Sequence, residues 1–428
     1  MELLNRIVRA APAESPRAEP RPRRLWVSNQ LIVAVSNDAI VHRTRSGASP
    51  ASVDLVDSLR RPFRAFERDG IIEEVVAINV DESSSSASLS ERIAFNVRAA
   101  RSEGSHNTVN LVRLAPGASV SDVRRALEDE PSVEYVERVP LRKVPAGRRR
   151  SVRAAWHLGA IGSVAPRAAD VDVAVLDTGL DESHSAISAH AYHHAGTSAE
   201  DISGHGTHVA GILAGLAGIK AGWHGVAGVK LHAWKIFGDV PNDDGDFEVD
   251  EALYQRALRA ALKARCKVVN LSIGGVRAST EERRLIKDLV NAGVAVVAAM
   301  GNEYEEGNPT EFPAALAGVI AVGAVDRAFA RASFSNTGEH VALVAPGVDI
   351  LSTLPMTKSA ARTKRETKWY AWDGTSMAAP QVAAAAAILL AQQPGADVRK
   401  LLAKKARRLA AMGTRSWTRT LGAGLLQL

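Results

Sequence analysis

The sequence predicts an α/β fold in two parts: a large three-layer domain with a mainly parallel sheet, and a small α+β domain before it. The length of 428 residues exceeds what one core usually organises, so at least two domains are expected. After about residue 154, continuous apolar runs alternate with helical segments, which is typical of parallel strands covered on both faces. Before residue 140, strand and helix signals follow the order β-α-β-β-α-β.

The small domain is predicted over residues 26–140, and its element order is ferredoxin-like. Residues 1–25 are rich in proline, arginine and alanine, and are expected to be disordered. Residues 81–105 are polar and serine-rich, and are expected to be an insertion between the two middle strands. The predicted strands are Leu31–Val35, Ile71–Ile78, Val109–Leu114 and Val133–Val139, and the main predicted helices are Ser52–Arg68 and Val120–Glu130.

The large domain is predicted over residues 154–428, after a basic linker at residues 141–153. Sites in parallel sheets form at the carboxyl ends of the strands. Asp177 stands at such an end, directly after a buried run. The predicted strands are Val171–Leu176, Leu231–Ile236, Lys267–Leu271, Val294–Ala299 and Val319–Val322.

Composition argues against several other classes of protein. Apolar residues make up 46% of the chain, yet no run reaches the roughly 18 residues of a membrane span, so no membrane partner is expected. The N-terminus lacks the apolar core of a signal peptide and Cys266 is the single cysteine, which together favour a cytoplasmic location. The net charge of +6 comes from scattered basic clusters without interleaved aromatics, so nucleic acid is not an expected partner.

Three segments contain an acid, a base and a nucleophile. Asp177 lies in VAVLDTGLD, His205 in SGHGTHVAG and Ser376 in DGTSMAAPQ. Serine is a poor nucleophile at neutral pH, so a histidine must accept its proton while a buried carboxylate orients that histidine. The pattern therefore indicates acyl transfer, and the chain order is Asp, His, Ser.

These three segments resemble the signature motifs of subtilisin-like serine peptidases, the subtilase family. The resemblance implies a subtilisin-like catalytic domain at residues 154–428 and a serine endopeptidase that acts through an acyl-enzyme. Residues 26–140 resemble the inhibitory propeptide of this family, which implies a self-inhibited zymogen with its own propeptide domain as an intramolecular inhibitor. An alternative is that this domain stays uncleaved, keeps the site closed and acts as a partner-binding regulatory module.

The resemblance also implies a substrate cleft for proteins or peptides. Asn302 matches the asparagine of the oxyanion hole, which stabilises the developing alkoxide. Ser272, Ile273 and Gly274 match the segment that pairs with the substrate backbone, and Ala299, Met300 and Gly301 would form the facing wall. Met300 stands where the family usually has a small residue, and is expected to alter the pocket wall.

The cleft is expected to favour basic residues. By resemblance, Glu311, before Phe312-Pro313, lies at the base of the pocket for P1, the residue before the cleaved bond, and Glu303 lies near its rim. Two carboxylates there would favour arginine or lysine. Alignment with mature subtilisin-like domains puts the processing site near Arg150 and Ser151 or at another basic residue in Arg142–Arg150.

No cofactor and no metal site are predicted. The region where the family carries a tight calcium loop reads LAGIKAGWHGVAGV, which offers no carboxylate or carboxamide ligand. His208 is interpreted as a structural histidine packed behind the site. The cluster of His190, His193 and His194 has ligand-like spacing but no fixed acidic or cysteine partner beside it. The acidic segment 242–246 is either a solvated loop or part of a substrate subsite.

Overall fold

The computed structural model describes residues 25–36, 63–78, 107–142, 149–150, 155–187, 191–193, 200–216, 222–242, 247–355 and 369–428. Several predictions fall outside these residues: the disorder at 1–24, the insertion at 81–105 and the first part of the helix predicted from Ser52.

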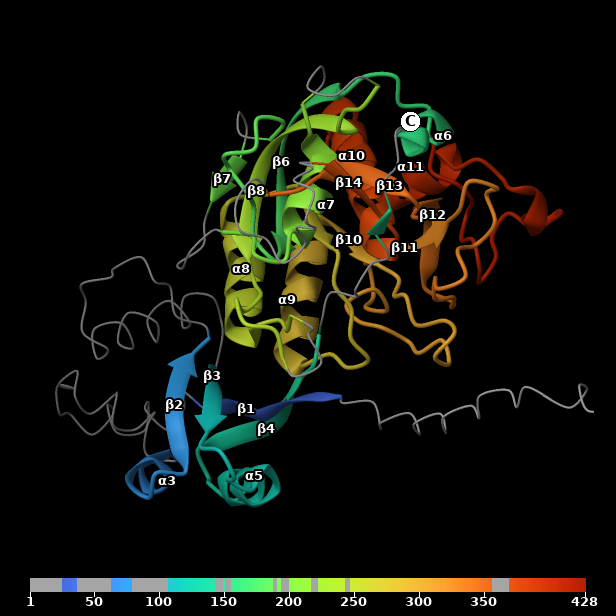
Figure 1. Cartoon of the computed structure of the whole chain (residues 1–428). Helices are drawn as coiled ribbons and strands as arrows, with labels where there is room; N and C mark the ends of the chain where they lie inside the picture. The colour runs from blue at the N-terminus through green and yellow to red at the C-terminus, as the bar shows by residue number, and fades with distance from the viewer. Residues whose placement is uncertain are drawn as a thin grey trace, which may run out of the picture.

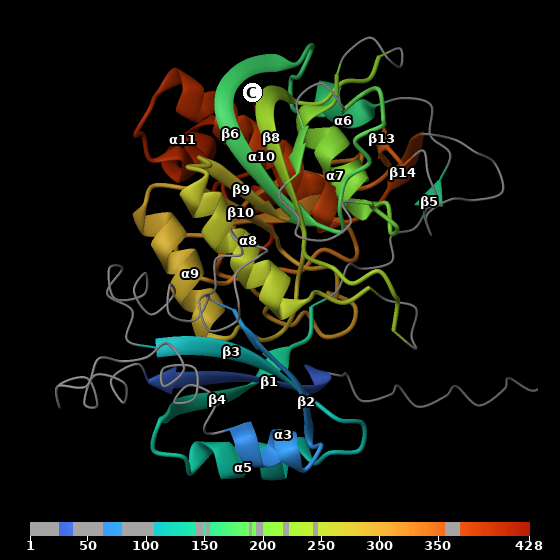
Figure 2. The ribbon, with the colours of Figure 1, turned by 90° about the vertical axis from the view of Figure 1, so that its left-hand side faces the viewer.

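The N-terminal domain is a four-stranded antiparallel sheet with two helices on one face (Figures 1 and 2). The strand order β2-β3-β1-β4 is that of a ferredoxin-like fold, so the predicted element order is confirmed. Ser119 caps helix α5 by accepting a hydrogen bond from the Asp122 backbone N–H at 3.3 Å. The elements are β1 (Trp26–Ser36), α3 (Arg64–Arg68), β2 (Ile72–Ala77), β3 (Asn107–Leu114), α5 (Val120–Glu128) and β4 (Val133–Pro140).

The C-terminal domain is built on a seven-stranded parallel sheet in the order β12-β11-β10-β9-β6-β8-β7. The five predicted strands are confirmed within a few residues, and the structure adds β7 and β12. The strands are β6 (Arg167–Asp177), β7 (Ala191–His193), β8 (Ala227–Lys235), β9 (Val268–Leu271), β10 (Ala295–Ala299), β11 (Ile320–Val325) and β12 (Val341–Pro346).

Helices cover both faces of this sheet, which makes three layers (Figure 2). Alternate residues of β6 enter different cores: Val173 and Val175 pack with α7 and α10, whereas Ala174 and Leu176 pack with α8 and α9. The helices are α6 (Trp156–Ala160), α7 (His205–Ala214), α8 (Glu251–Lys263), α9 (Thr280–Asn291), α10 (Thr375–Gln392), α11 (Val398–Lys405) and the 3-10 turn η2 (Ala410–Met412).

Among the described residues, α10 is the one helix long and apolar enough to span a bilayer. Of its apolar window, 89% is buried inside the domain, as expected for the central helix of a folded core.

A small antiparallel sheet lies at the edge of the C-terminal domain. It consists of β13 (Ile350–Thr353), β14 (Trp369–Trp372) and β5 (Arg149–Arg150). In β5, Arg150 pairs with Ala371 and Arg149 with Trp372. Part of the segment that joins the two domains is therefore a strand on the C-terminal domain.

The two domains pack together through the open face of the N-terminal sheet (Figures 1 and 2). Ala252 of α8 belongs to the same apolar cluster as residues of β1, β3 and β4. Arg113 of β3 donates to Asp250 Oδ2 at 3.1 Å, and the Glu137 carboxylate of β4 accepts from the Thr280 backbone N–H at 2.9 Å. The sheet thus covers the N-terminal ends of α8 and α9, where carboxylates are favoured by the helix dipole.

Candidate active site

Asp177 and His205 form a buried hydrogen-bonded pair. Asp177 ends β6 and His205 begins α7, and the two side chains are 1% and 2% exposed. His205 Nδ1–H donates to Asp177 Oδ1 at 2.7 Å, and the Thr178 backbone N–H donates to the same oxygen at 2.7 Å. A proton held on Nδ1 by the carboxylate leaves Nε2 unprotonated in the neutral imidazole, and Nε2 has no hydrogen-bond partner among the described residues.

Asp201 holds this pair in place, and sequence reasoning missed it. Its carboxylate accepts from Thr178 Oγ1 at 2.8 Å, from the Gly204 N–H at 2.7 Å and from the Thr207 N–H at 2.8 Å. It therefore links the turn after Asp177 to the start of α7. Burial raises the pKa of Asp201, and these hydrogen bonds oppose the rise. The sequence did hold a sign of this role, because Asp201 lies four residues before His205 and acidic residues are favoured near the start of a helix.

Ser376 is the second residue of α10, whose N-terminal end faces the carboxyl edge of the sheet. Its hydroxyl donates to the Ser272 carbonyl oxygen at 3.2 Å. Helices α7 and α10 pack against each other, so His205 and Ser376 stand at neighbouring helix starts. A turn of the Ser376 hydroxyl away from Ser272 would present it to a base.

Pro380 lies at the sixth position of α10, beyond the first turn, because the helix begins at Thr375. At this sixth position its missing N–H deprives the Ser376 carbonyl of a helical hydrogen bond. Ser272 Oγ donates to that carbonyl at 2.9 Å and replaces the lost bond. The Ser272 hydroxyl thus ties the end of β9 to the nucleophile's own turn.

Two hydrogen-bond donors converge beside Ser376. Asn302 Oδ1 accepts from the Thr375 N–H at 2.8 Å and from Thr375 Oγ1 at 2.9 Å, which turns its Nδ2 away from Thr375. Asn302 Nδ2 and the Ser376 backbone nitrogen each lie 3.6 Å from the same point, where a Cβ on Gly374 would stand. Two donors close to one point beside a serine are compatible with an oxyanion hole.

The two predicted cleft walls meet at Glu311. A glycine follows the end of each of the strands β9 and β10, and both glycines lie against the Glu311 side chain. A Cβ on Gly274 would lie 2.0 Å from Glu311 Oε2, and a Cβ on Gly301 would lie 2.9 Å from the Glu311 carboxyl carbon. Glu311 is 3% exposed. A buried carboxylate therefore occupies the space between the two segments, and both glycines are required for its approach.

The other residues predicted for the cleft walls are mostly buried. Ser272, Ile273, Ala299 and Met300 are all buried. The Met300 side chain packs in the apolar core near Gly338, so the expectation that it alters the pocket wall is not supported by its position. Glu303 is half-buried, and its carboxylate accepts from the Asn302 backbone N–H at 2.7 Å.

Trp372 and His208 pack behind the Asp177–His205 pair. The Trp372 ring stacks on His205 at 5.9 Å and on His208 at 4.8 Å between centroids. His208 Nε2–H donates to the Tyr370 carbonyl at 3.0 Å, and burial lowers its pKa to about 3. His208 is thus a neutral packing residue, as the sequence indicated. Trp372 was missed, although it is the aromatic residue directly before DGTS.

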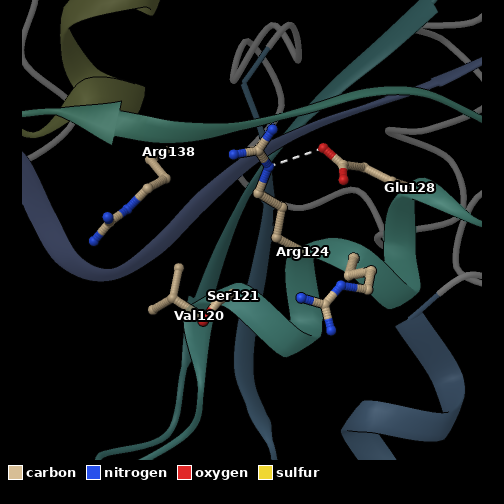
Figure 3. A pocket seen from close by; sticks show the side chains of 6 residues that line it. Val120, Ser121, Arg124, Glu128 and Arg138 are labelled. Carbon is tan, nitrogen blue, oxygen red and sulfur yellow. Dashed lines mark hydrogen bonds and ion pairs between the residues drawn. The ribbon is translucent and has the colours of Figure 1, made fainter.

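Ser151, His190, His194 and residues 243–246 lie outside the described residues, as does the side chain of His193. Among the described residues, no cluster of three potential metal ligands occurs. A hollow of about 340 Å³ lies on the N-terminal domain beside α5 (Figure 3). It is lined by Val120, Ser121, Arg124, Arg125, Glu128 and Arg138, with Arg124 paired to Glu128, and it has no nucleophile–base pair like that of the C-terminal domain.

Comparison with known proteins defines the class. The subtilase family model matches residues 168–424. Subtilisin E of Bacillus subtilis (strain 168) is 34% identical over 283 residues, covering 63% of this chain and 68% of subtilisin E. The major intracellular serine protease of the same organism is 36% identical over 248 residues, covering 54% of this chain and 72% of that protein.

A crystal structure of fervidolysin from Fervidobacterium pennivorans, a keratinolytic enzyme related to subtilisin, has the same fold, with a TM-score of 0.69 at 23% identity. The match covers 94% of this chain and 60% of the fervidolysin chain. The fold and the family match define a serine peptidase built on a parallel α/β sheet. The chain belongs to the subtilase family, and it is a subtilisin-like serine endopeptidase in class.

Proposed function

We propose that this protein hydrolyses peptide bonds through an acyl-enzyme formed on Ser376, with His205 as base and Asp177 as its orienting carboxylate. The observation that carries the proposal is the buried 2.7 Å contact between His205 Nδ1 and Asp177, made at the start of a helix that packs on the Ser376 helix. Ser376 Oγ attacks the peptide carbonyl, and Nε2 accepts its proton and later returns it to the leaving amine. Asn302 Nδ2 and the Ser376 N–H stabilise the oxyanion.

The N-terminal domain acts in this proposal as an inhibitor in the same chain. Its support is the position of the segment that follows β4. The Arg142 carbonyl accepts from the Val249 N–H at 3.0 Å, and the Leu141 carbonyl lies 2.5 Å from the Cβ position of Gly275, next to the cleft wall. Further along the chain, β5 pairs with β14, whose Trp372 stacks on His205. Leu141 and Arg142 thus stand beside the cleft wall and β5 stands beside the ring that packs on His205, so in this proposal both hinder the entry of substrates.

Self-cleavage after a basic residue of the linker is the expected result for the purified full-length protein. Arg142 occupies a pocket of its own, so the remaining basic residues are Lys143, Arg148, Arg149 and Arg150, with Arg150–Ser151 favoured by the family alignment. Incubation followed by sequencing of new N-termini checks this, with Ser376→Ala as the uncleavable control. A wild-type chain that stays intact while it reacts with a fluorophosphonate would instead support the alternative of an uncleaved regulatory domain.

The position of Glu311 supports a preference for arginine or lysine at P1. A cation that enters between the Gly274 and Gly301 segments meets a buried carboxylate, and charge-assisted hydrogen bonds there are stronger than in water. Arginine presents a planar fork of donors that matches the geometry of a carboxylate.

Glu311→Gln should lower kcat/KM for substrates with arginine at P1 by about 10- to 100-fold, since a hydrogen bond between charged groups contributes about 1.5–3 kcal/mol. Cleavage after leucine should stay the same or rise. A P1 peptide library measures both. The control is Glu306→Gln, an exposed carboxylate in the neighbouring loop, which should leave the profile unchanged. A profile dominated by leucine or phenylalanine in both the parent and Glu311→Gln would refute the assignment.

A further inference from the structure

The positive net charge of the chain comes from its C-terminal segment, residues 398–428. This segment contains eight basic and no acidic side chains, whereas residues 1–397 contain two more acidic than basic residues. So uneven a distribution of charge within one chain is typical of proteins that bind a polyanion. The basic residues are Arg399, Lys400, Lys404, Lys405, Arg407, Arg408, Arg415 and Arg419.

The fold places all eight basic side chains at the surface. The apolar residues of the segment face inward: Val398 and Leu402 pack in the core around α10, whereas Leu409, Met412 and Leu421 pack with residues of β11 and β12. The basic residues alternate with these buried positions and are all exposed. They form a basic surface over α11, η2 and the adjoining turns.

Most of these charges have no carboxylate beside them. Lys400 pairs with Asp397 at 3.0 Å and Arg419 pairs with Glu339 at 2.9 Å, and both pairs are exposed to solvent. The other six basic residues make no recorded ion pair within the part of the chain that the structure describes. Like charges without counter-charges repel one another, so a bound polyanion would stabilise this surface.

Helix stability explains only a part of the charge. Lys404 and Lys405 lie in the last turn of α11, where the helix dipole favours cations. The basic residues that follow the helix gain nothing from this dipole, because its effect fades within one turn.

The basic surface lies far from the nucleophile. Ser376 is at the start of α10, and α11 begins at Val398, shortly after α10 ends. An 18-residue helix is about 27 Å long, so α10 separates the two. The helix α11 and the N-terminal domain lie at opposite ends of the molecule (Figures 1 and 2). A large partner at the basic surface therefore leaves the cleft free.

The basic surface offers charge without apolar or aromatic contacts. Among the described residues, the large apolar side chains that are exposed are Val164, Val240 and Tyr304, all outside the segment. Trp417 is the aromatic residue of the segment, and its half-buried ring donates Nε1–H to the Val341 carbonyl at 2.9 Å. The surface thus lacks platforms for stacking bases and side chains for entering acyl chains.

We propose that the basic surface adsorbs the protein to membranes that carry anionic phospholipids, with the cleft open to the solution. Clusters of lysine and arginine are attracted to such membranes, and each cation near the headgroups strengthens adsorption about fivefold. A lipid surface imposes no spacing on the cations, which suits charges spread over a short helix and its adjoining turns. The expectation that the chain has no membrane partner rested on the lack of a spanning segment, and adsorption through charge needs none.

Vesicle sedimentation of the full chain carrying Ser376→Ala tests the proposal without turnover. At about 0.1 M salt the protein should sediment with phosphatidylcholine vesicles that contain about 30% phosphatidylglycerol, and should stay in solution with pure phosphatidylcholine vesicles. Raising the salt to about 0.5 M should release it, because screening weakens the attraction. Equal sedimentation with both kinds of vesicle, or sedimentation that survives high salt, would overturn adsorption through charge.

Two matched pairs of substitutions locate the contact. Lys404→Gln with Lys405→Gln removes two adjacent charges from α11 and should lower partition onto the anionic vesicles by about 10- to 30-fold. Arg124→Gln with Arg125→Gln removes two adjacent charges from the exposed side of α5 and should leave partition at the parent value. An equal loss in both pairs would show an effect of net charge alone, and unchanged partition in the α11 pair would exclude the basic surface.

A duplex of about 20 base pairs, in the same buffer, distinguishes lipid from nucleic acid. The Ser376→Ala chain should bind the anionic vesicles more tightly than the duplex when binding is compared per phosphate. Tighter binding to the duplex would assign the basic surface to nucleic acid and overturn the lipid proposal. Hydrolysis of a soluble peptide by the active chain with the α11 substitutions should equal that of the parent. Vesicle binding by a chain that hydrolyses no peptide would contradict the proposed function alone.

Discussion

Replacing Ser376 with alanine should reduce kcat for peptide hydrolysis by about a millionfold and abolish labelling by a fluorophosphonate. The reason is that the acyl-enzyme cannot form without the nucleophile, and residual turnover would come from oxyanion stabilisation and binding alone. Single-turnover hydrolysis of an arginine peptide and gel-based labelling measure the two effects. Ser333→Ala, at an exposed serine of the same domain, should match the parent in both.

His205→Ala should lower kcat almost as much as Ser376→Ala, and the double variant should be no worse than either, because the groups act as one unit. Thermal unfolding of each variant should remain cooperative, since the start of α7 is also held by Asp201. Substantial hydrolysis by pure Ser376→Ala would remove Ser376 from the mechanism. A loss in His205→Ala that simply multiplies the loss in Ser376→Ala would argue against a shared step.

Replacing Asn302 with alanine should lower kcat by about 10²–10³ and leave KM almost unchanged, because its amide stabilises charge that develops only in the transition state. Its Oδ1 is engaged by Thr375, so the Nδ2 donor is oriented before substrate arrives.

Asn302→Asp separates the two roles of that side chain. It retains an acceptor for Thr375 but lacks the donor, so it should lose at least as much activity as Asn302→Ala. Asn308→Ala serves as the control, since Asn308 bonds to Thr337 instead of Thr375. If kcat in Asn302→Ala stayed within about threefold of the parent, Asn302 would not be an oxyanion donor.

The sequence predicted the elements that repeat a regular pattern. Strands such as β9 and β10 are continuous apolar runs, and α5 begins at a capping serine, so local chemistry determines both. Asp177, His205 and Ser376 could be proposed as a triad from the sequence because each lies inside a long motif. Their positions at the end of β6 and at the starts of α7 and α10 follow from the parallel sheet.

The buried ion pairs of Arg142 could not be predicted, because they join distant parts of the chain. Arg142 pairs with Glu251, 109 residues away, and with Glu282, 140 residues away. In the sequence alone, each of these charged residues looks like an ordinary surface residue, because charged side chains are seldom buried. Only the structure shows that they are buried together. Arg142 was instead placed in a basic linker as one of several cleavage sites.

At the Ser376 carbonyl, a hydrogen bond from the Ser272 hydroxyl replaces the helical bond that Pro380 cannot make, and this replacement limits which substitutions the chain tolerates. With proline at 380, loss of the Ser272 hydroxyl leaves a buried carbonyl without a donor, at a cost of about 1–3 kcal/mol. With alanine at 380, the helix would supply that donor itself, and the same loss at 272 would cost less. The two positions are therefore epistatic, although they are far apart in the sequence. A survey of single substitutions in the present sequence would therefore overstate how strictly a hydroxyl is needed at 272, because part of that requirement comes from Pro380.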